Sequence, residues 1–91
     1  MGWYVYILRC ADGRCYYGST GELSRRLAEH RLGESRWTAS RRPVELVYFE
    51  TCETSAQARQ RERSFKNGRT RRKTLERMIA DFPAEKLTPF A

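Results

Sequence analysis

The sequence has no long apolar run and no recognisable export signal. Its longest apolar run, Val5 to Leu8, is far shorter than the ~20 residues that a membrane-spanning helix needs. Residues 1–10 also lack the basic region and the cleavage site of a signal peptide. We therefore expect a soluble cytoplasmic protein with no membrane partner.

Cysteine and histidine are scarce. The three cysteines, Cys10, Cys15 and Cys52, form no C-x-x-C pair, and His30 is the only histidine. A disulfide framework would leave one thiol over, and a zinc site would have to be assembled irregularly. We expect reduced cysteines that pack as small hydrophobic side chains.

The chain is also short, since its 91 residues leave no room for a second folded domain. With 40% hydrophobic and 12% aromatic residues, grouped in runs, it is too apolar for a disordered protein. We expect one domain over residues 1–82, followed by a short C-terminal tail over residues 83–91.

Positive charge is abundant and concentrated. The net charge is +7, and residues 59–77 carry nine basic and two acidic side chains, whereas the rest of the chain is nearly balanced. Such a segment favours a polyanionic partner, nucleic acid before an anionic membrane, although a solvated helix face is the alternative. We expect nucleic acid to contact this segment and the basic loop before the third strand, through Arg36, Arg41, Arg42, Arg59, Arg63, Lys66, Arg69, Arg71, Arg72 and Lys73.

Two aromatic and β-branched segments, residues 3–9 and 15–18, predict a hairpin. A two-residue loop at Asp12-Gly13 would place Tyr6 and Tyr16 on opposite faces of the sheet. A three-residue loop, which begins one residue earlier, would place both tyrosines on one face. The sequence favours neither loop strongly, but a site shared by the two tyrosines requires the longer one.

The next segment predicts a helix and then a third strand. The helix begins at Ser19 or Thr20, with Ser19 and Glu22 as a capping box, and ends near Gly33. The strand covers residues 44–50. This segment is rich in β-branched and aromatic side chains, which are typical of strands.

Two further helices complete the chain. Thr54 and Gln57 cap a helix that ends at Asn67, and a last helix follows Thr70 and stops before Pro83. The order ββαβαα predicts an α+β fold, with a three-stranded, largely antiparallel sheet and flanking helices.

One residue of the helix before Asn67 is out of place. Ala58, Glu62 and Phe65 recur at the helical period, so Glu62 should lie on the inward edge. A buried carboxylate is costly unless it is paired or bound to a cation. Glu62 is therefore a partner in a structural ion pair, or a metal ligand or general base. Four nearby cations could pair with it: Arg59, Arg61, Arg63 and Lys66.

Arg26 and His30 stand four residues apart on the first helix. A lone helical histidine is often structural, and an arginine here would by itself be a surface residue. Together with Glu62 and the tyrosines, however, they supply the groups that phosphodiester cleavage needs: an arginine for the phosphate, an acid or base, and a carboxylate for a divalent metal.

The same residues occur in a characteristic order. Tyr4-Val5-Tyr6 is followed by Tyr16-Tyr17-Gly18, then by Arg26 and His30 in an R-x-x-x-H arrangement, and by Glu62 in a later helix. This set resembles the GIY-YIG nuclease superfamily, and in particular its small stand-alone bacterial members of the YhbQ and YazA type.

The resemblance covers about residues 3–80 and implies a DNA endonuclease domain that uses one Mg²⁺ or Mn²⁺ ion and no small-molecule cofactor. Two motif positions differ, because Tyr4 replaces the glycine of GIY and Tyr17 replaces the isoleucine of YIG. Many active members also carry an asparagine about one helix length after the glutamate, where this chain has Thr74.

Carried over by motif position, the family's residue roles fall on five side chains. The resemblance implies that Tyr6 deprotonates the attacking water and that Tyr16 helps to orient water or phosphate. Arg26 would hold the scissile phosphate, and Glu62 would be the carboxylate ligand of the metal. His30 matches a histidine of some branches, for which proton transfer is the suggested role.

We therefore expect an enzyme that hydrolyses DNA, at branched or damaged structures, and that associates with the nucleoid of a bacterial cell. A free-standing domain has few contacts for reading base sequence, so its specificity should be for shape or strandedness. The alternatives are a catalytically silent nucleic-acid-binding module and an accessory subunit in DNA repair.

Overall fold

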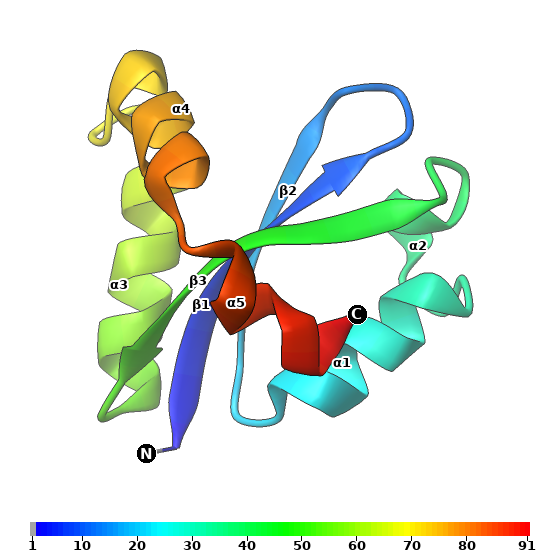
Figure 1. Ribbon diagram of the computed structural model, residues 1–91. Coiled ribbons are helices and arrows are strands. Elements are labelled where there is room, and N and C mark those ends of the chain that lie inside the picture. The colour runs from blue at the N-terminus through cyan, green and yellow to red at the C-terminus, as the bar shows by residue number, and fades with distance from the viewer. Residues whose placement is uncertain (1) are drawn as a thin grey trace.

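A computed structural model describes residues 2–91 as a three-stranded sheet with helices on both faces (Figure 1). The elements, in chain order, are β1 (Trp3–Cys10), β2 (Cys15–Thr20), α1 (Leu23–Arg31), α2 (Arg36–Ala39), β3 (Val44–Cys52), α3 (Ser55–Lys66), α4 (Arg72–Asp81), α5 (Ala84–Leu87) and the 3-10 turn η1 (Thr88–Phe90). The sheet order is β2-β1-β3, and both neighbouring pairs are antiparallel. This architecture confirms the predicted α+β fold.

Strand β1 lies at the centre of the sheet, which explains its nearly continuous apolar sequence. Val5 and Ile7 point to the face that α3 and α4 cover, whereas Tyr6 and Leu8 point to the face that α1 covers (Figure 1). All four side chains are buried. The sheet therefore separates two small cores, whose other buried members are Val47, Phe65 and Leu75 on the first face and Leu23, Leu27 and Leu46 on the second.

The β1–β2 hairpin has the three-residue loop. Leu8 pairs with Tyr16, and the Cys10 amide donates to the carbonyl of Arg14 over 2.8 Å. Gly13 closes the loop with a φ of 87°, a left-handed conformation that favours glycine. Tyr6 and Tyr16 consequently lie on one face of the sheet, as a shared site requires.

The first helix begins later than predicted. β2 continues through Ser19, which pairs with Val5, and α1 starts only at Leu23. The capping box predicted for Ser19 and Glu22 is wrong, because the Ser19 hydroxyl donates to a carboxylate of α3 and Glu22 makes no side-chain cap. Strand pairing takes precedence over the local cap signal. The Glu22 amide instead donates to the hydroxyl of Thr20 over 3.0 Å.

The predicted starts and ends of α3 and α4 agree with the structure, whereas the expected burial of Leu75, Met78, Ile79 and Phe82 is only partly met. Thr54 and Gln57 form a reciprocal capping box at the start of α3, which ends with Asn67 as its C-cap. Gly68 follows with a φ of 81°, as expected after a helix end. Of the four apolar residues at 75, 78, 79 and 82, Leu75 is buried and the other three are half-buried.

Two segments have more structure than the sequence predicts. The basic loop before β3 contains the short helix α2, and residues 83–91 contain α5 and η1. Phe90 of η1 packs on Phe49 with ring centroids 5.4 Å apart, and its carbonyl accepts a hydrogen bond from Arg31 of α1. The C-terminal residues thus cover part of the second core.

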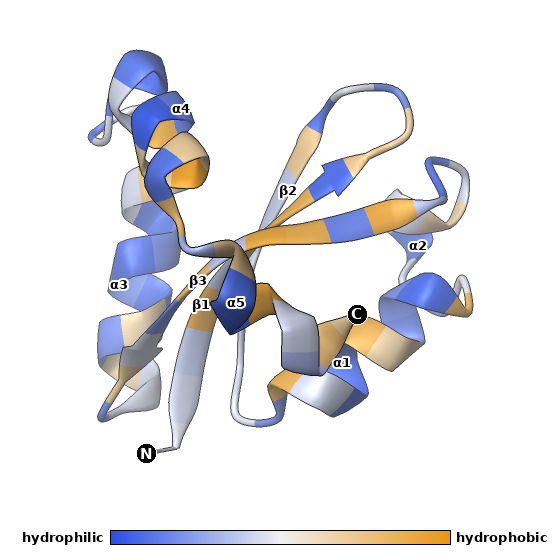
Figure 2. Cartoon of the chain, viewed as in Figure 1, coloured by the Kyte–Doolittle hydropathy of each residue, from blue (hydrophilic) through white to orange (hydrophobic). Residues whose placement is uncertain are grey.

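The distribution of hydropathy matches this arrangement. In Figure 2, hydrophobic residues lie along much of β3, on part of β1 and on the sheet-facing side of α4, whereas β2 is mostly pale and α3 is largely hydrophilic. Only Ala58 and Phe65 of α3 are buried, so most of the basic segment lies on the surface. Within residues 2–91, no helix combines the length and apolar character needed to cross a membrane.

Candidate active site

Tyr6 projects from the central strand towards edge strand β2. Its side chain is 1% exposed, and its hydroxyl lies 3.0 Å from Nε2 of His30. The phenol crosses directly over Gly18, where an added Cβ would lie 2.5 Å from the Tyr6 hydroxyl oxygen. Because Gly18 has no side chain, the phenol of Tyr6 can extend from the central strand over the edge strand β2.

His30 is fully buried, with 0% exposure, and its second ring nitrogen is also bonded. Nδ1 lies 2.8 Å from the Thr38 hydroxyl oxygen, and that hydroxyl donates its single hydrogen to the carbonyl of Ser35. When Thr38 donates to Ser35 it accepts from His30, and on this pairing we assign the imidazole proton to Nδ1. Nε2 is then the acceptor, and Tyr6 donates its hydroxyl proton to it.

Both members of this buried pair are neutral at pH 7. Burial, followed by the positive charge of Arg26, lowers the pKa of His30 to about 4. Burial is also the main cause that raises the pKa of Tyr6, and the nearby Tyr16 adds to it, whereas the charge of Arg26 opposes the rise. In the resting site the phenol therefore keeps its proton.

Tyr16 and Arg26 border this pair. The ring centroid of Tyr16 lies 4.8 Å from that of His30 and 6.2 Å from that of Tyr6. Arg26 is half-buried, and its Nη1 donates to Oε1 of Glu29 over 2.7 Å. Because Arg26 affects the pKa values of both Tyr6 and His30, its guanidinium belongs to the same cluster.

Glu62 reaches the cluster from the opposite face, across edge strand β2. Its carboxylate oxygen Oε1 accepts from the Ser19 hydroxyl over 2.8 Å, and Oε2 lies 2.6 Å from Nζ of Lys66. Ser19 directly follows Gly18, over which the Tyr6 hydroxyl lies. The two functional groups thus lie at adjacent residues of one edge strand, and the charge of Glu62 contributes to the raised pKa of Tyr6.

The chemistry of this donor set fits a hydrated divalent ion. Residues 2–91 contain no group of three or more His, Cys, Asp or Glu side chains that could hold a metal. Mg²⁺, however, is commonly held by one or two carboxylates with waters and substrate oxygens. Glu62 is oriented by Ser19 and already attracts a cation, the Lys66 ammonium. The Lys66 side chain is 51% exposed and can withdraw into solvent.

The expected ion pair of Glu62 is therefore present, and Lys66 is the partner. Arg61, another of the four cations considered, binds both carboxylate oxygens of Glu50 instead. This pairing joins α3 to β3 and takes Arg61 away from the site. The ion pair and a metal site are compatible, because an exposed lysine can exchange with a divalent cation.

The ten basic residues expected to bind nucleic acid are nearly all exposed. The exception is Arg41, whose guanidinium is paired with Asp12 at 3.3 Å and stacks on Trp37 at 4.1 Å from the ring centroid. Arg42 is exposed but donates to the carbonyl of Ala39. Both residues hold the α2 segment in place. The other eight expose their side chains to solvent: Arg36, Arg59, Arg63, Lys66, Arg69, Arg71, Arg72 and Lys73.

Two residues that shape the site could not be identified from the sequence. Ser19 was assigned to a helix cap, yet it orients Glu62. Thr38 carried no signal, because it lies in a segment expected to be a loop and meets His30 only in the folded chain.

Comparison with known proteins agrees with the geometry. Residues 2–76 match the family described as the GIY-YIG catalytic domain. The chain is 47% identical to the UPF0213 protein DP2720 of Desulfotalea psychrophila over 76 residues, which cover 80% of this chain and 69% of that protein. It is 44% identical to the UPF0213 protein NP_0776A of Natronomonas pharaonis over 79 residues, or 86% and 91% of the two chains.

A solved structure is also similar. The solution NMR structure of the UPF0213 protein BH0048 from Bacillus halodurans has a TM-score of 0.58 and 31% sequence identity, over 100% of this chain and 98% of that one. The sequence match, the three-stranded fold and the tyrosine, arginine and glutamate cluster all point the same way. The chain therefore belongs to the GIY-YIG family of nuclease domains.

Proposed function

We propose that the protein is a divalent-metal-dependent endonuclease that hydrolyses DNA phosphodiester bonds. The observation that carries the proposal is the buried hydrogen bond between Tyr6 and His30, whose phenol lies over Gly18, next in sequence to the Ser19 that binds Glu62. A purely structural pair would not need a carboxylate among cations at the same edge of the sheet. Tyr6, Tyr16, Arg26, His30 and Glu62 form the proposed catalytic set.

Tyr6 and His30 would move the proton of the attacking water together. The raised pKa of Tyr6 and the lowered pKa of His30 both oppose a separated tyrosinate and imidazolium pair at rest. A concerted transfer avoids a free tyrosinate: the Tyr6 oxygen takes a proton from water while its own proton passes to Nε2, and the imidazolium that results would return its proton through Tyr6 to the leaving oxygen. Thr38 keeps the proton on Nδ1, so Nε2 remains free to accept.

Arg26 and Glu62 would handle the phosphate. The guanidinium of Arg26 has five donors and can bind phosphate oxygens in a bidentate manner. A divalent ion held by Glu62 would neutralise the charge that develops on the phosphate during cleavage. Tyr16, whose ring contacts that of His30, would orient the phosphate or the water.

A panel of labelled duplex, flap, junction and single-stranded DNAs with Mg²⁺ or Mn²⁺ tests this function. We expect cleavage that is strongest on branched or damaged structures. Tyr6→Phe, which removes the hydroxyl, and Glu62→Gln, which removes the charge, should each lower the rate by orders of magnitude. Glu85→Gln is the matched control, because it removes the charge of an exposed glutamate of α5 outside the cluster.

The alternative outcomes are distinct. Glu62→Gln should leave DNA affinity equal or higher, since a negative charge near the phosphate is removed. Glu62→Gln also removes the ion pair with Lys66. Because Lys66 is exposed, we expect only a small loss of folding stability from Glu62→Gln. No metal-dependent cleavage of any substrate, together with unchanged DNA binding by both variants, would favour a silent binding module or an accessory subunit instead.

A further inference from the structure

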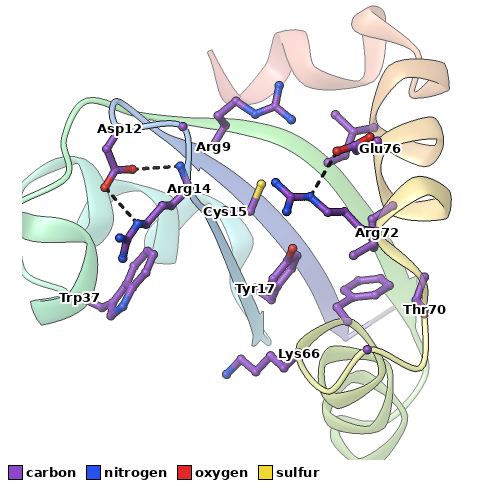
Figure 3. A pocket seen from close by; sticks show the side chains of 15 residues that line it. Arg9, Asp12, Arg14, Cys15, Tyr17, Trp37, Lys66, Thr70, Arg72 and Glu76 are labelled. Atoms are coloured by element: carbon purple, nitrogen blue, oxygen red, sulfur yellow. Dashed lines mark hydrogen bonds and ion pairs between the residues drawn. The ribbon is translucent and has the colours of Figure 1, made fainter.

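A basic and aromatic cleft lies next to the catalytic cluster, on the other face of edge strand β2. It has a volume of about 730 Å³ and opens between the β1–β2 hairpin, α2 and the α3–α4 segment. Figure 3 shows Trp37 on one side of the cleft, Tyr17 at its centre, and Lys66 and Arg72 reaching in from other elements. None of the proposed catalytic residues lines it.

The aromatic side chains suit the faces of nucleobases. Trp37 is one of two large hydrophobic residues that are exposed among residues 2–91, with 38% exposure. Its ring is held in place, because Arg41 stacks on it and pairs with Asp12 of the hairpin loop. Tyr17 occupies the motif position where isoleucine is usual, and its ring is supported by Phe65 at 5.9 Å. Neither aromatic face has a role in the proposed cleavage.

The charges of the cleft suit a phosphate backbone. Four cations line it, namely Arg9, Arg14, Lys66 and Arg72, against two carboxylates, Asp12 and Glu76. Arg14, Lys66 and Arg72 take part in ion pairs, and their side chains are more than half exposed. Exposed ion pairs are weak, so these cations can exchange their partners for phosphate oxygens.

The cleft also adjoins the catalytic cluster at two points. Trp37 lies 5.7 Å from Tyr16 between ring centroids, and Tyr16 in turn contacts His30. Lys66 lines the cleft and pairs with Glu62. A strand seated in the cleft would therefore lead to the edge of β2, where Tyr6 lies over Gly18 and Glu62 binds Ser19.

We propose that this cleft binds single-stranded DNA, with an unpaired base stacked on Trp37 and its neighbour near Tyr17. The proposal rests on the proposed function, since it makes the cleft the part that recognises the unpaired strand of a branched substrate. Aromatic platforms combined with a basic groove are typical of single-strand binding. A stacked duplex offers no free base face, so a duplex would gain nothing from Trp37.

Binding without metal separates this site from catalysis. Fluorescence anisotropy in EDTA would compare a labelled thymidine oligonucleotide of about 12 nucleotides with an abasic strand of equal length and with a duplex. We expect Trp37→Ala to weaken binding of the thymidine strand by about tenfold and Trp37→Phe to weaken it less, since stacking on an aromatic ring contributes much of the affinity for an unpaired base. Affinity for the abasic strand and the duplex should change by less than about twofold, because their binding is mainly electrostatic.

A second measurement does not depend on an alanine variant. In Trp3→Phe protein, Trp37 is the only tryptophan, and the thymidine strand should quench its fluorescence while the abasic strand does not. Tyr17→Leu, which keeps an apolar side chain against Phe65, should also weaken single-strand binding selectively.

Several results would overturn the proposal that the cleft binds single-stranded DNA. These are equal losses on all three probes, no loss from Trp37→Ala, no selective quenching, or no measurable binding of the thymidine strand. If the wild type cleaves DNA but its binding does not depend on Trp37, the proposed single-strand site is refuted and the proposed nuclease function is retained. Trp37-dependent binding without cleavage of any substrate would do the reverse.

Discussion

Gly18 shows how one missing side chain builds the site. The Tyr6 phenol occupies the space above it, and an added Cβ would also lie 3.0 Å from the ring of Tyr16. Real Cβ atoms essentially never approach another heavy atom to 2.5 Å, so a side chain at Gly18 must displace a buried phenol. The absence of a side chain at Gly18 is therefore what allows the proposed catalytic hydroxyl of Tyr6 to lie above β2.

We accordingly expect Gly18→Ala to displace Tyr6 and to reduce cleavage strongly, because the hydroxyl would leave Nε2 of His30. Gly21→Ala is a matched control, since its added Cβ would meet no atom closer than 3.5 Å. The cleavage rates and the melting temperatures of both variants are the measurements. Equal rates for the two variants would contradict this role of Gly18.

Thr38 is a positioning residue for His30. Thr38→Val keeps the shape of the side chain but leaves the Nδ1 proton without an acceptor, which should cost about 1–3 kcal/mol of folding stability. It should also let the proton move to Nε2 and so slow cleavage. Thr38→Ser should restore both properties.

The ¹⁵N chemical shifts of the His30 ring report the tautomer directly. In the wild type and in Thr38→Ser they should show a protonated Nδ1, and in Thr38→Val a mixture or the other tautomer. A wild-type ring protonated on Nε2 would reverse the direction of the hydrogen bond with Tyr6 and refute the proposed relay.

The start of α4 is the element whose charges most need a functional explanation. Arg71 is its N-cap, and Arg72 and Lys73 follow in the first turn, which contains no acidic side chain. The N-terminal end of a helix carries partial positive charge, so three cations there are unfavourable for the helix. Folding stability alone does not account for them.

Replacing these three residues with glutamine should therefore have opposite effects on folding and binding. The melting temperature should stay equal or rise slightly, while affinity for any DNA falls. The slope of log affinity against log salt should flatten by ~0.9 for each phosphate of B-DNA that the variant no longer neutralises. A triple variant of exposed residues outside the basic segment, Arg25→Gln with Arg31→Gln and Lys86→Gln, controls for total charge. An unchanged slope in the variant of Arg71, Arg72 and Lys73 would indicate a merely solvated face.

The molecule as a whole folds around a sheet with a small core on each face. Its second core includes a fully buried imidazole, and the neutral form of His30 is strongly favoured in the folded state. The folded pKa of about 4 lies below the ordinary value of 6.5. Between these values the unfolded chain binds more protons, so the free energy of unfolding should fall as the pH drops from 6.5 towards 4.

This loss should disappear when His30 is replaced. Each unit of pKa difference corresponds to about 1.4 kcal/mol, and pH 5 lies about 1.5 units below the ordinary pKa of 6.5, so His30 should account for roughly 2 kcal/mol of the loss between pH 7 and pH 5. Urea unfolding of the wild type and of His30→Gln at pH 7 and at pH 5 measures the difference between their slopes. Parallel pH profiles would show that His30 titrates normally and is not held neutral.

Local chemistry accounts for the elements that the sequence predicts well. The cap of α3 at Thr54 and Gln57 and its end at Asn67 depend on neighbouring backbone groups, so nearby residues suffice to define them. Ser19 carried a similar local signal, but pairing with Val5 and the bond to Glu62 involve residues far away in the chain, and they extended β2 instead. A cap motif cannot reveal such a competition.

The candidate residues could be selected from the sequence because their chemical types and order are unusual for a surface helix or a core strand. Their roles depend on distant contacts. Tyr6 meets His30 across 24 residues, and the tautomer of His30 depends on Thr38 in a helix that the sequence did not predict. Two sterically acceptable hairpin loops were open, and the tertiary packing that pairs Leu8 with Tyr16 selects the one that brings the tyrosines together. Composition and local pattern can thus indicate the chemistry, whereas proton direction, carboxylate orientation and the neighbouring cleft arise from side chains that only folding brings into contact.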